Sequence, residues 1–286
     1  MSQKTVLITG ATAGIGLAGA QELGRRGWKV LVHARNEARG KGALETLRAA
    51  VPRGDFDVVT GDLSSLKSVA ELARQVAAKA PVLDALWNNA GGIQSERKAS
   101  ADGVELQMAV NHLAAFALTS RLLPQLKAAP AGRVVATSSG AHPLAPGNIQ
   151  DWFLDRPGKY RPMQVYGQTK LANILFTQEL NRRLAGTSVT AHSFHPGFVR
   201  TSFGSGGDPS KKSVFEMMGF LALPPEKGAD TGVFLVDDPE PAKTPGRYWV
   251  KRKPKNPSGK ATLEAGARLW AQSEALVEKA WQKAEV

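Results

Sequence analysis

The chain has 286 residues, of which 42% are hydrophobic and 22% charged, and its 37 Lys and Arg against 25 Asp and Glu give a net charge of +12. The hydrophobic residues fall in regular runs, which excludes a disordered chain, and the length suffices for one large α/β domain. The absence of cysteine excludes disulfides, thiolate catalysis and cysteine-based metal sites.

The first ten residues, MSQKTVLITG, are predicted to enter a strand, and they lack the basic start and the long apolar stretch of a signal peptide. Its most apolar long stretch, residues 113–123, contains Ser120 and Arg121 and is well short of the roughly 20 residues of a membrane helix. We therefore expect a soluble, cytoplasmic protein with no membrane anchor.

Seven short runs rich in Val, Ile and Leu alternate with helical stretches along the chain. The predicted strands are 5–9, 29–33, 57–60, 83–87, 133–138, 189–194 and 248–250, and the clearest helices are 14–26, 38–50, 66–79 and 166–184. This alternation predicts right-handed crossovers and a parallel sheet covered on both faces. We predict a doubly wound (Rossmann) α/β fold with about seven strands, in a single domain over residues 1–286.

Two long stretches interrupt this alternation, residues 140–161 and 198–225, and a basic loop plus helix follows at 243–286. Long loops in a compact domain often carry function. Apolar side chains gather in the first two: Trp152, Phe153, Phe198, Phe203, Phe215, Met217, Met218 and Phe220. We expect these loops to enclose a hydrophobic substrate, while some of the side chains belong to the core.

The segment TGATAGIG, residues 9–16, joins the first predicted strand to the first helix. Its glycines, Gly10, Gly14 and Gly16, allow a tight turn and a close approach of backbone to a pyrophosphate at the helix N-terminus. The spacing differs from the usual G-x-G-x-x-G, so purely structural glycines are the alternative.

The second predicted strand ends in Arg35 and Asn36, without a carboxylate. NAD sites usually hold the ribose with an acidic residue at this place, and NADP sites hold the 2′-phosphate with an arginine. We therefore favour NADP(H) over NAD, although an ordinary surface arginine is the alternative.

Two further short motifs follow the third and fourth strands, Asp62-Leu63 and Asn88-Asn89-Ala90-Gly91. These are the strand ends where open parallel sheets bind ligands, although Asp, Asn and Gly are common in any turn.

Ser139 ends the fifth strand, and Tyr166 and Lys170 lie one turn apart on the following helix. A nearby ammonium group lowers the pKa of a phenol, so Tyr166 is predicted to act as a general acid or base. Ser139 is predicted to hydrogen-bond the substrate oxygen. A Tyr-x3-Lys pair alone also fits an ordinary surface pair.

Together these motifs resemble the short-chain dehydrogenase/reductase family. The matching pieces are TGATAGIG, Asp62-Leu63, NNAG at 88–91, Asn111, Ser139, YGQTK at 166–170 and PGFVRT at 196–201. The stretch from YGQTK to PGFVRT and the late GARLWAQSEALV are similar to the retinol dehydrogenase branch. Membrane-bound members of that branch carry an N-terminal hydrophobic anchor, whereas this sequence starts at the first predicted strand. We therefore expect carbonyl chemistry but do not expect retinoid metabolism to be the biological role.

The resemblance implies a catalytic tetrad of Asn111, Ser139, Tyr166 and Lys170. Lys170 would also bind the nicotinamide ribose, and Asn111 would hold a water in a proton relay. The whole predicted cofactor set is Gly10, Thr12, Gly14, Ile15, Gly16, Arg35, Asn36, Asp62, Leu63, Asn89, Ala90, Gly91, Tyr166, Lys170, Pro196, Gly197, Val199 and Thr201.

These observations predict an NADP(H)-dependent oxidoreductase that interconverts a carbonyl compound and its alcohol. The alternative is an NADP(H)-sensing regulatory protein with little turnover, and a nucleic-acid binder ranks third. The family forms homodimers and homotetramers through the helices that bear Asn111 and Tyr166, and also monomers.

Two further sets of residues have both functional and structural interpretations. The five histidines show no metal-binding spacing, so we predict no metal; His142 could line the substrate entrance or be a structural loop residue. The basic cluster within 243–260 could bind a polyanion, but no recognition motif accompanies it, and we favour a solvated loop without nucleic acid.

Overall fold

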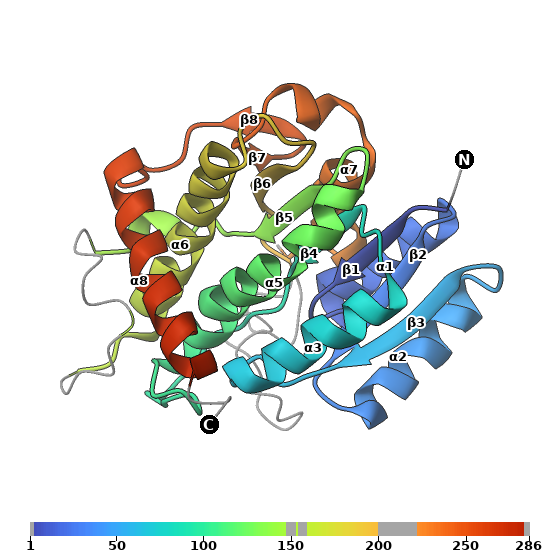
Figure 1. Ribbon diagram of the computed structural model, residues 1–286, viewed down its shortest axis with the longest axis horizontal. Coiled ribbons are helices and arrows are strands. Elements are labelled where there is room, and N and C mark those ends of the chain that lie inside the picture. The colour runs from blue at the N-terminus through green and yellow to red at the C-terminus, as the bar shows by residue number, and fades with distance from the viewer. Residues whose placement is uncertain (1–2, 147–152, 154–158, 200–221, 283–286) are drawn as a thin grey trace.

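A computed structural model describes residues 3–146, 153, 159–199 and 222–282 (Figure 1). Its strands form one eight-stranded sheet in the order β3-β2-β1-β4-β5-β6-β7-β8, parallel except for the antiparallel pair β7–β8. The strands are β1 (Thr5–Ile8), β2 (Lys29–Ala34), β3 (Asp55–Thr60), β4 (Ala85–Asn88), β5 (Arg133–Thr137), β6 (Thr190–His195), β7 (Tyr248–Val250) and β8 (Lys253–Lys255). The doubly wound fold predicted from the sequence is confirmed.

Helices cover both faces of this sheet. One face carries α1 (Gly14–Arg25), α2 (Glu37–Ala50) and α7 (Pro225–Asp237). The other carries α3 (Leu66–Lys79), α5 (Ala114–Ala128) and α6 (Pro162–Arg183), with α8 (Leu263–Gln282) packed mainly on α6. A short helix, α4 (Leu106–Met108), and a π-helical turn, Ala109–Leu113, lead into α5.

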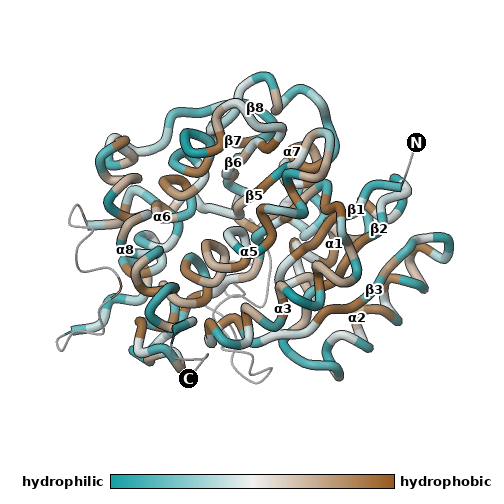
Figure 2. Tube along the Cα trace, viewed as in Figure 1, coloured by the Kyte–Doolittle hydropathy of each residue, from teal (hydrophilic) through white to brown (hydrophobic). Residues whose placement is uncertain are grey.

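The hydrophobic pattern of the sequence explains this arrangement. The central strands are buried on both sides, as in β1 and β4, where every residue is buried. In α3, Val69, Leu72 and Val76 recur at helical spacing and face the sheet, while the outer face is polar. Figure 2 shows the same division, with hydrophobic colour along the strands and hydrophilic colour on the outer turns of the helices.

The eighth strand, β8, lies within the basic segment that the sequence analysis treated as a loop. It pairs with β7 across a two-residue turn in which Lys251 and Arg252 both have positive φ, 51° and 58°. Its residues, Lys253, Pro254 and Lys255, are all exposed at the edge of the sheet. Lysine and proline on an edge strand discourage pairing with another chain, which gives these residues a structural role.

The chain order reverses beside β1, because β2 and β3 lie on one side of it and β4 to β8 on the other. In such sheets ligands bind in the crevice outside the carboxyl ends of the strands at the reversal. Within the described residues, no helix combines the length and the apolar character needed to span a bilayer.

Candidate active site

A cleft of about 500 Å³ opens at the carboxyl edge of the sheet, at this reversal. Fourteen of the predicted site residues line it: Gly10, Thr12, Gly14, Ile15, Arg35, Asp62, Leu63, Asn89, Ala90, Gly91, Asn111, Tyr166, Lys170 and Pro196. Residues from both halves of the chain therefore meet in one site.

The glycine-rich turn between β1 and α1 forms one wall of the cleft. Gly10 and Gly14 have φ of +63° and +55°, which side-chain-bearing residues rarely adopt. Gly16 is buried beneath the turn, where a Cβ would lie 2.5 Å from the Gly10 carbonyl oxygen. The N-cap, Ala13, gives no side-chain hydrogen bond to the first turn of α1, so nothing from this residue covers the positive end of the helix.

His33, the fifth residue of β2, holds this turn in position. Its Nδ1 accepts the Gly10 N–H at 3.1 Å, and its Nε2 donates to the Gly61 carbonyl at 2.9 Å. Burial lowers its pKa, which favours the neutral ring that this pair of bonds requires. The link spans β1, β2 and β3, so sequence spacing could not reveal it.

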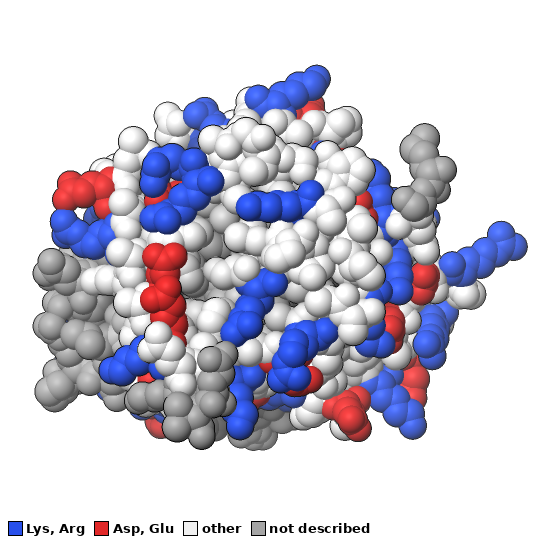
Figure 3. Space-filling model, in the orientation of Figure 1, with Lys and Arg blue, Asp and Glu red and all other residues white. Residues whose placement is uncertain are grey.

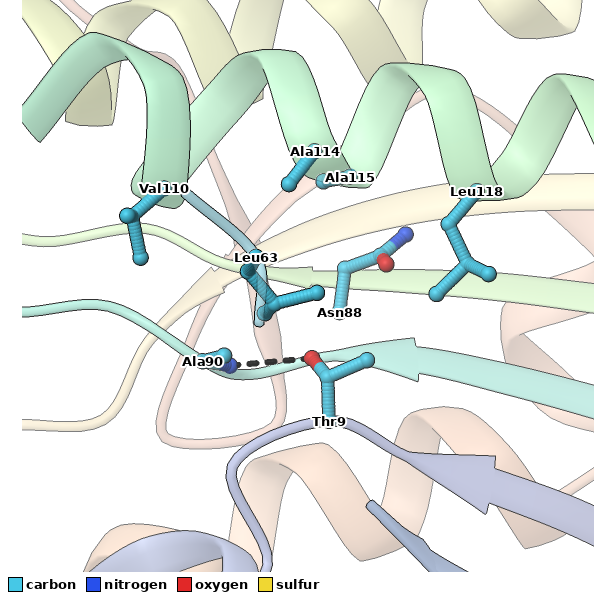
Figure 4. Close-up of a pocket in the computed structure, with 8 residues that line it drawn as sticks. All are labelled: Thr9, Leu63, Asn88, Ala90, Val110, Ala114, Ala115 and Leu118. Carbon is cyan, nitrogen blue, oxygen red and sulfur yellow. Dashed lines mark hydrogen bonds between the residues drawn. The ribbon is translucent and has the colours of Figure 1, made fainter. Parts of the chain in front are cut away.

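Thr9 and Asn89 join the glycine-rich turn to the loop after β4. The Thr9 hydroxyl accepts the N–H of Asn89 at 2.9 Å and the N–H of Ala90 at 3.0 Å, and Figure 4 shows the second of these bonds. The Asn89 amide donates to the carbonyls of Thr9 and Gly10. In the same view Leu63 lies between Ala90 and the helical turn of Val110, and these three residues also line the cleft.

The far end of the cleft is cationic. Arg35 follows β2, and Arg39, which the sequence analysis missed, lines the cleft from the first turn of α2. The Asn36 side chain accepts the Arg39 N–H at 3.0 Å and caps α2. Asn36 does not line the cleft, so its predicted cofactor contact stays a prediction.

Asp62 lies close to Arg35. Its carboxylate accepts both the N–H and the hydroxyl of Ser64, at 2.9 and 2.8 Å. Burial alone would raise the pKa of Asp62, but these bonds and the positive Arg35 hold it below its usual value.

Three of the four predicted catalytic residues, Asn111, Tyr166 and Lys170, line the other end of the cleft, and Ser139 lies against Tyr166 without lining it. A hydrogen bond joins the side chains of Tyr166 and Ser139, and Lys170 Nζ lies 5.4 Å from the centre of the Tyr166 ring. Lys170 donates to the Thr137 carbonyl at 2.9 Å. A Cβ at Gly91 would lie 3.0 Å from Asn111 Oδ1 and 3.5 Å from Lys170 Nζ, which places both side chains around this glycine.

The π-helical turn sets the position of Asn111, and such turns often occur at functional sites. Its amide oxygen accepts the Gly92 N–H, and its amide nitrogen donates to the Gly92 carbonyl, both at 2.9 Å. The nitrogen also lies 3.1 Å from the Thr169 hydroxyl. The side chain is therefore fixed on the catalytic side of the loop after β4.

The pKa of Tyr166 differs from the expectation. We expected a neighbouring ammonium to lower it, whereas in this structure burial raises the pKa of Tyr166 above its usual value, with the bond to Ser139 acting in the opposite direction. Burial also lowers the pKa of Lys170 to about 8. The reason for the difference is that both groups are withdrawn from water, at 7% and 2% exposure, which disfavours each charged form.

Comparisons with known proteins identify the family. A family model described as short chain dehydrogenase matches residues 4–149. Human retinol dehydrogenase 14 is 39% identical over 97% of this chain and 87% of its own length. The chain belongs to the short-chain dehydrogenase family.

Two solved structures share the fold of this short-chain dehydrogenase. An uncharacterized protein from Mycobacterium paratuberculosis has a TM-score of 0.76 at 34% identity, covering 97% of this chain and 94% of that one. A short chain dehydrogenase from Burkholderia cenocepacia J2315, in complex with NADP, has a TM-score of 0.67 at 23% identity, covering 86% and 94%.

The residues of this short-chain dehydrogenase fit NAD(P)(H), the cofactor of its family. The glycine-rich turn leaves no room for side chains, and the cleft joins the end of α1 to the arginines and to Tyr166. Gly197, with φ of +89°, and buried Val199 follow Pro196 without lining the cleft.

Some predicted residues lie outside the described part of the chain: Thr201, Trp152, Phe203, Phe215, Met217, Met218 and Phe220. Phe153 is a core residue, buried with its ring 5.9 Å from that of His112.

Proposed function

We propose that this protein is an NADP(H)-dependent oxidoreductase that interconverts a ketone or aldehyde and its alcohol. The observation that carries the proposal is the single cleft with two different ends. Arg35 and Arg39 lie at one end, and Tyr166, Lys170 and Asn111 at the other. This arrangement suits a long dinucleotide whose reactive ring must lie beside a proton donor.

The preference for NADP(H) rests on the arginines at the end of β2. Two guanidinium groups beside the cleft suit the dianionic 2′-phosphate of NADP(H). The cleft also contains the carboxylate of Asp62. This carboxylate already accepts two hydrogen bonds from Ser64 and is stabilised by the positive charge of Arg35. Asp62 is thus less suited to hold the free ribose hydroxyl that NAD(H) would present.

In this proposal the nicotinamide supplies or accepts the hydride, and the chain's own residues handle the proton. Tyr166 is neutral near pH 7, since the ordinary pKa of a phenol is about 10 and burial raises it further, so it can donate its hydroxyl proton to the oxygen of a carbonyl substrate. Ser139, already bonded to Tyr166, would position that oxygen. Lys170 would stabilise the phenolate left behind, since its ammonium group lies beside the ring.

The roles of Asn111 and of the loops complete the proposal. Asn111 fixes the loop at Gly92, and a water relay through it stays a prediction. The apolar substrate is proposed from the sequence of the two loops and from the retinol dehydrogenase relatives.

The test is oxidation of NADPH, with NADH in parallel, across aldehydes and ketones from short and polar to long and apolar, retinal included. We expect turnover with NADPH, highest kcat/KM for apolar carbonyls. Tight NADPH binding without turnover on any carbonyl would instead favour the sensor alternative.

A further inference from the structure

The loop that carries Ser139 is fixed at several points, and two of them are histidines. This serine loop, residues 138–145, follows β5 and includes the short 3-10 turn His142–Leu144. At its start the Ser138 hydroxyl donates to the Lys170 carbonyl at 2.7 Å. The side chains of Ser139 and Tyr166 are hydrogen-bonded. A shift of the loop would move Ser139 away from Tyr166 and break this bond.

His195 holds the loop from the end of β6. Its Nδ1 accepts the Gly140 N–H at 3.0 Å. A ring nitrogen that accepts a hydrogen bond carries no proton, so the proton of the neutral ring lies on Nε2. The residue next to Ser139 thus depends on an unprotonated nitrogen of His195.

His142 holds the loop from its other side. Its Nδ1 lies 2.8 Å from the Ser139 carbonyl, which can only accept, so this nitrogen carries the proton. Its Nε2 accepts the Ser258 N–H at 3.0 Å, and the ring lies edge-on to Tyr248 with centroids 5.2 Å apart. Both ring nitrogens bond to backbone, which argues against His142 as a free group at the substrate entrance.

The remaining neighbours leave the loop little freedom. A Cβ at Gly167 of α6 would lie 2.7 Å from the Ala141 carbonyl oxygen, so the helix and the loop are in close contact. Lys260 Nζ donates to the carbonyls of Pro143 and Ala145.

We propose that His142 and His195 are positioning residues that hold Ser139 for catalysis, and that each must be neutral to do so. The catalytic part of this inference rests on the proposed function; the neutral, hydrogen-bonded state of the two rings does not.

The proposal implies a loss of activity on acidification. Burial lowers the pKa of both histidines, and the neighbouring His142 lowers that of His195 further. The charged or titratable groups that contact the pair or its loop are the two rings themselves, Tyr248 and Lys260. Both rings are therefore neutral at pH 7 and become charged only as the pH falls below the usual value of about 6.5. A charged His195 would then oppose an N–H with an N–H at Gly140, and a charged His142 would do the same at Ser258.

The first test reads the protonation of the rings without turnover. In ¹⁵N-histidine-labelled protein at pH 7, we expect His142 to carry its proton on Nδ1 and His195 on Nε2, assigned by comparison with the variants His142→Asn and His195→Asn. The opposite tautomer at either residue, or a cationic ring at pH 7, would overturn the proposal whether or not the protein is an enzyme.

The second test compares two replacements of His195. Asn can place its Oδ1 where Nδ1 accepts from Gly140 but does not titrate, whereas Ala removes the acceptor. We expect His195→Ala to lower kcat for carbonyl reduction about ten- to a hundredfold with unchanged NADPH affinity. His195→Asn should restore kcat to within about threefold of the parent and weaken the loss of activity below pH 6.5.

Equal losses in His195→Asn and His195→Ala, or full activity in His195→Ala, would contradict the positioning role. If His195→Ala does not fold, the tautomers and the pH profile of His195→Asn still decide. If the parent protein shows the expected tautomers but reduces no carbonyl, the proposed function fails, whereas the hydrogen bonds of the neutral His142 and His195 rings to the serine loop are confirmed.

Discussion

At the scale of single residues, Arg35 gives the sharpest test of cofactor preference. It lines the cleft at the end of β2 and is exposed, so its removal should leave the fold intact. We expect Arg35→Ala to weaken NADPH binding about tenfold to a hundredfold, the cost of a charge-assisted hydrogen bond, with little effect on NADH. Titration of the two cofactors by fluorescence checks this, and parallel losses would refute the contact with the 2′-phosphate.

Lys170 should govern the alkaline side of the pH profile. Burial lowers its pKa to about 8 in the free protein, whereas Tyr166 keeps its proton there because its own pKa is raised. The ammonium is present below pH 8 and lost above it, so kcat/KM for carbonyl reduction should fall as the pH rises through 8. A guanidinium does not titrate in this range, so residual activity of Lys170→Arg should lack that limb. An unchanged limb at pH 8 in this variant would assign it to another group.

The sequence predicted most of the residues of the site but not how they hold one another. The glycine-rich turn, Arg35, Tyr166 and Lys170 carry recognisable local signals, and they do meet in one cleft. His33 gave no such signal, because its two bonds reach Gly10 and Gly61 on neighbouring strands. The pKa of Tyr166 depends on burial by the folded chain, which spacing along the sequence does not measure.

At the scale of secondary-structure elements, the contact between α6 and the serine loop leaves no room for an added methyl group. A Cβ at Gly167 would lie 2.7 Å from the Ala141 carbonyl oxygen and 3.0 Å from Leu144 Cβ. We expect Gly167→Ala to lower the free energy of unfolding by about 1–3 kcal/mol through overpacking. It should also lower kcat while NADPH affinity stays, because the loop carries Ser139, whereas the glycine-rich turn and the arginines proposed to hold the dinucleotide lie elsewhere in the cleft.

Gly42 offers the matched control for this substitution. It lies on an exposed turn of α2, where a Cβ meets nothing within 4 Å. Gly42→Ala should leave kcat unchanged and stabilise the protein by up to about 1 kcal/mol through helix propensity. Thermal unfolding and steady-state kinetics measure both variants; equal behaviour of the two would show that α6 and the loop are not in tight contact.

The sequence predicted which segments are strands and which are helices. It did not predict the short edge strand β8 or the residue at which α6 begins. The central strands β1, β4 and β5 show apolar runs that burial on both faces explains. Strand β8 has no apolar residue except Pro254 and exists through its pairing with β7, so no periodic signal marks it. Helix α6 begins at Pro162, earlier than the predicted start at Tyr166, because proline is well suited to a first helical turn.

At the scale of the whole molecule, α8 covers surfaces of α5 and α6 that would otherwise be accessible to a second copy of the chain. It packs on α6 and reaches α5 and α3, burying Leu269 and Trp270. The Trp270 ring lies 4.8 Å from that of Phe116 on α5 and 6.1 Å from that of Phe176 on α6. A homodimer formed through α5 and α6 would have to displace this helix.

We therefore expect the protein to be a monomer of 30.5 kDa in light scattering at micromolar concentration. Deletion of α8 should expose the apolar faces of α5 and α6 and cause self-association. A stable dimer of the full chain, with α8 protected from hydrogen exchange, would show that association uses another surface.

The positive charge has structural explanations in part. Arg252 pairs with Asp230, Lys260 bonds the serine loop, and Lys253 and Lys255 lie on the sheet edge. On the face seen in Figure 3, Lys and Arg side chains are spread out with acidic ones among them. An excess of positive charge would also attract an anionic dinucleotide over longer range.

The most direct test of the central claim is the Tyr166→Phe variant, measured for NADPH binding and for NADPH-dependent carbonyl reduction. The substitution removes one hydroxyl that is bonded to Ser139 and leaves the ring beside Lys170. The account predicts nearly unchanged NADPH affinity and a loss of turnover of about a hundredfold or more, the contribution of a positioned acid. Turnover close to that of the parent protein would contradict it.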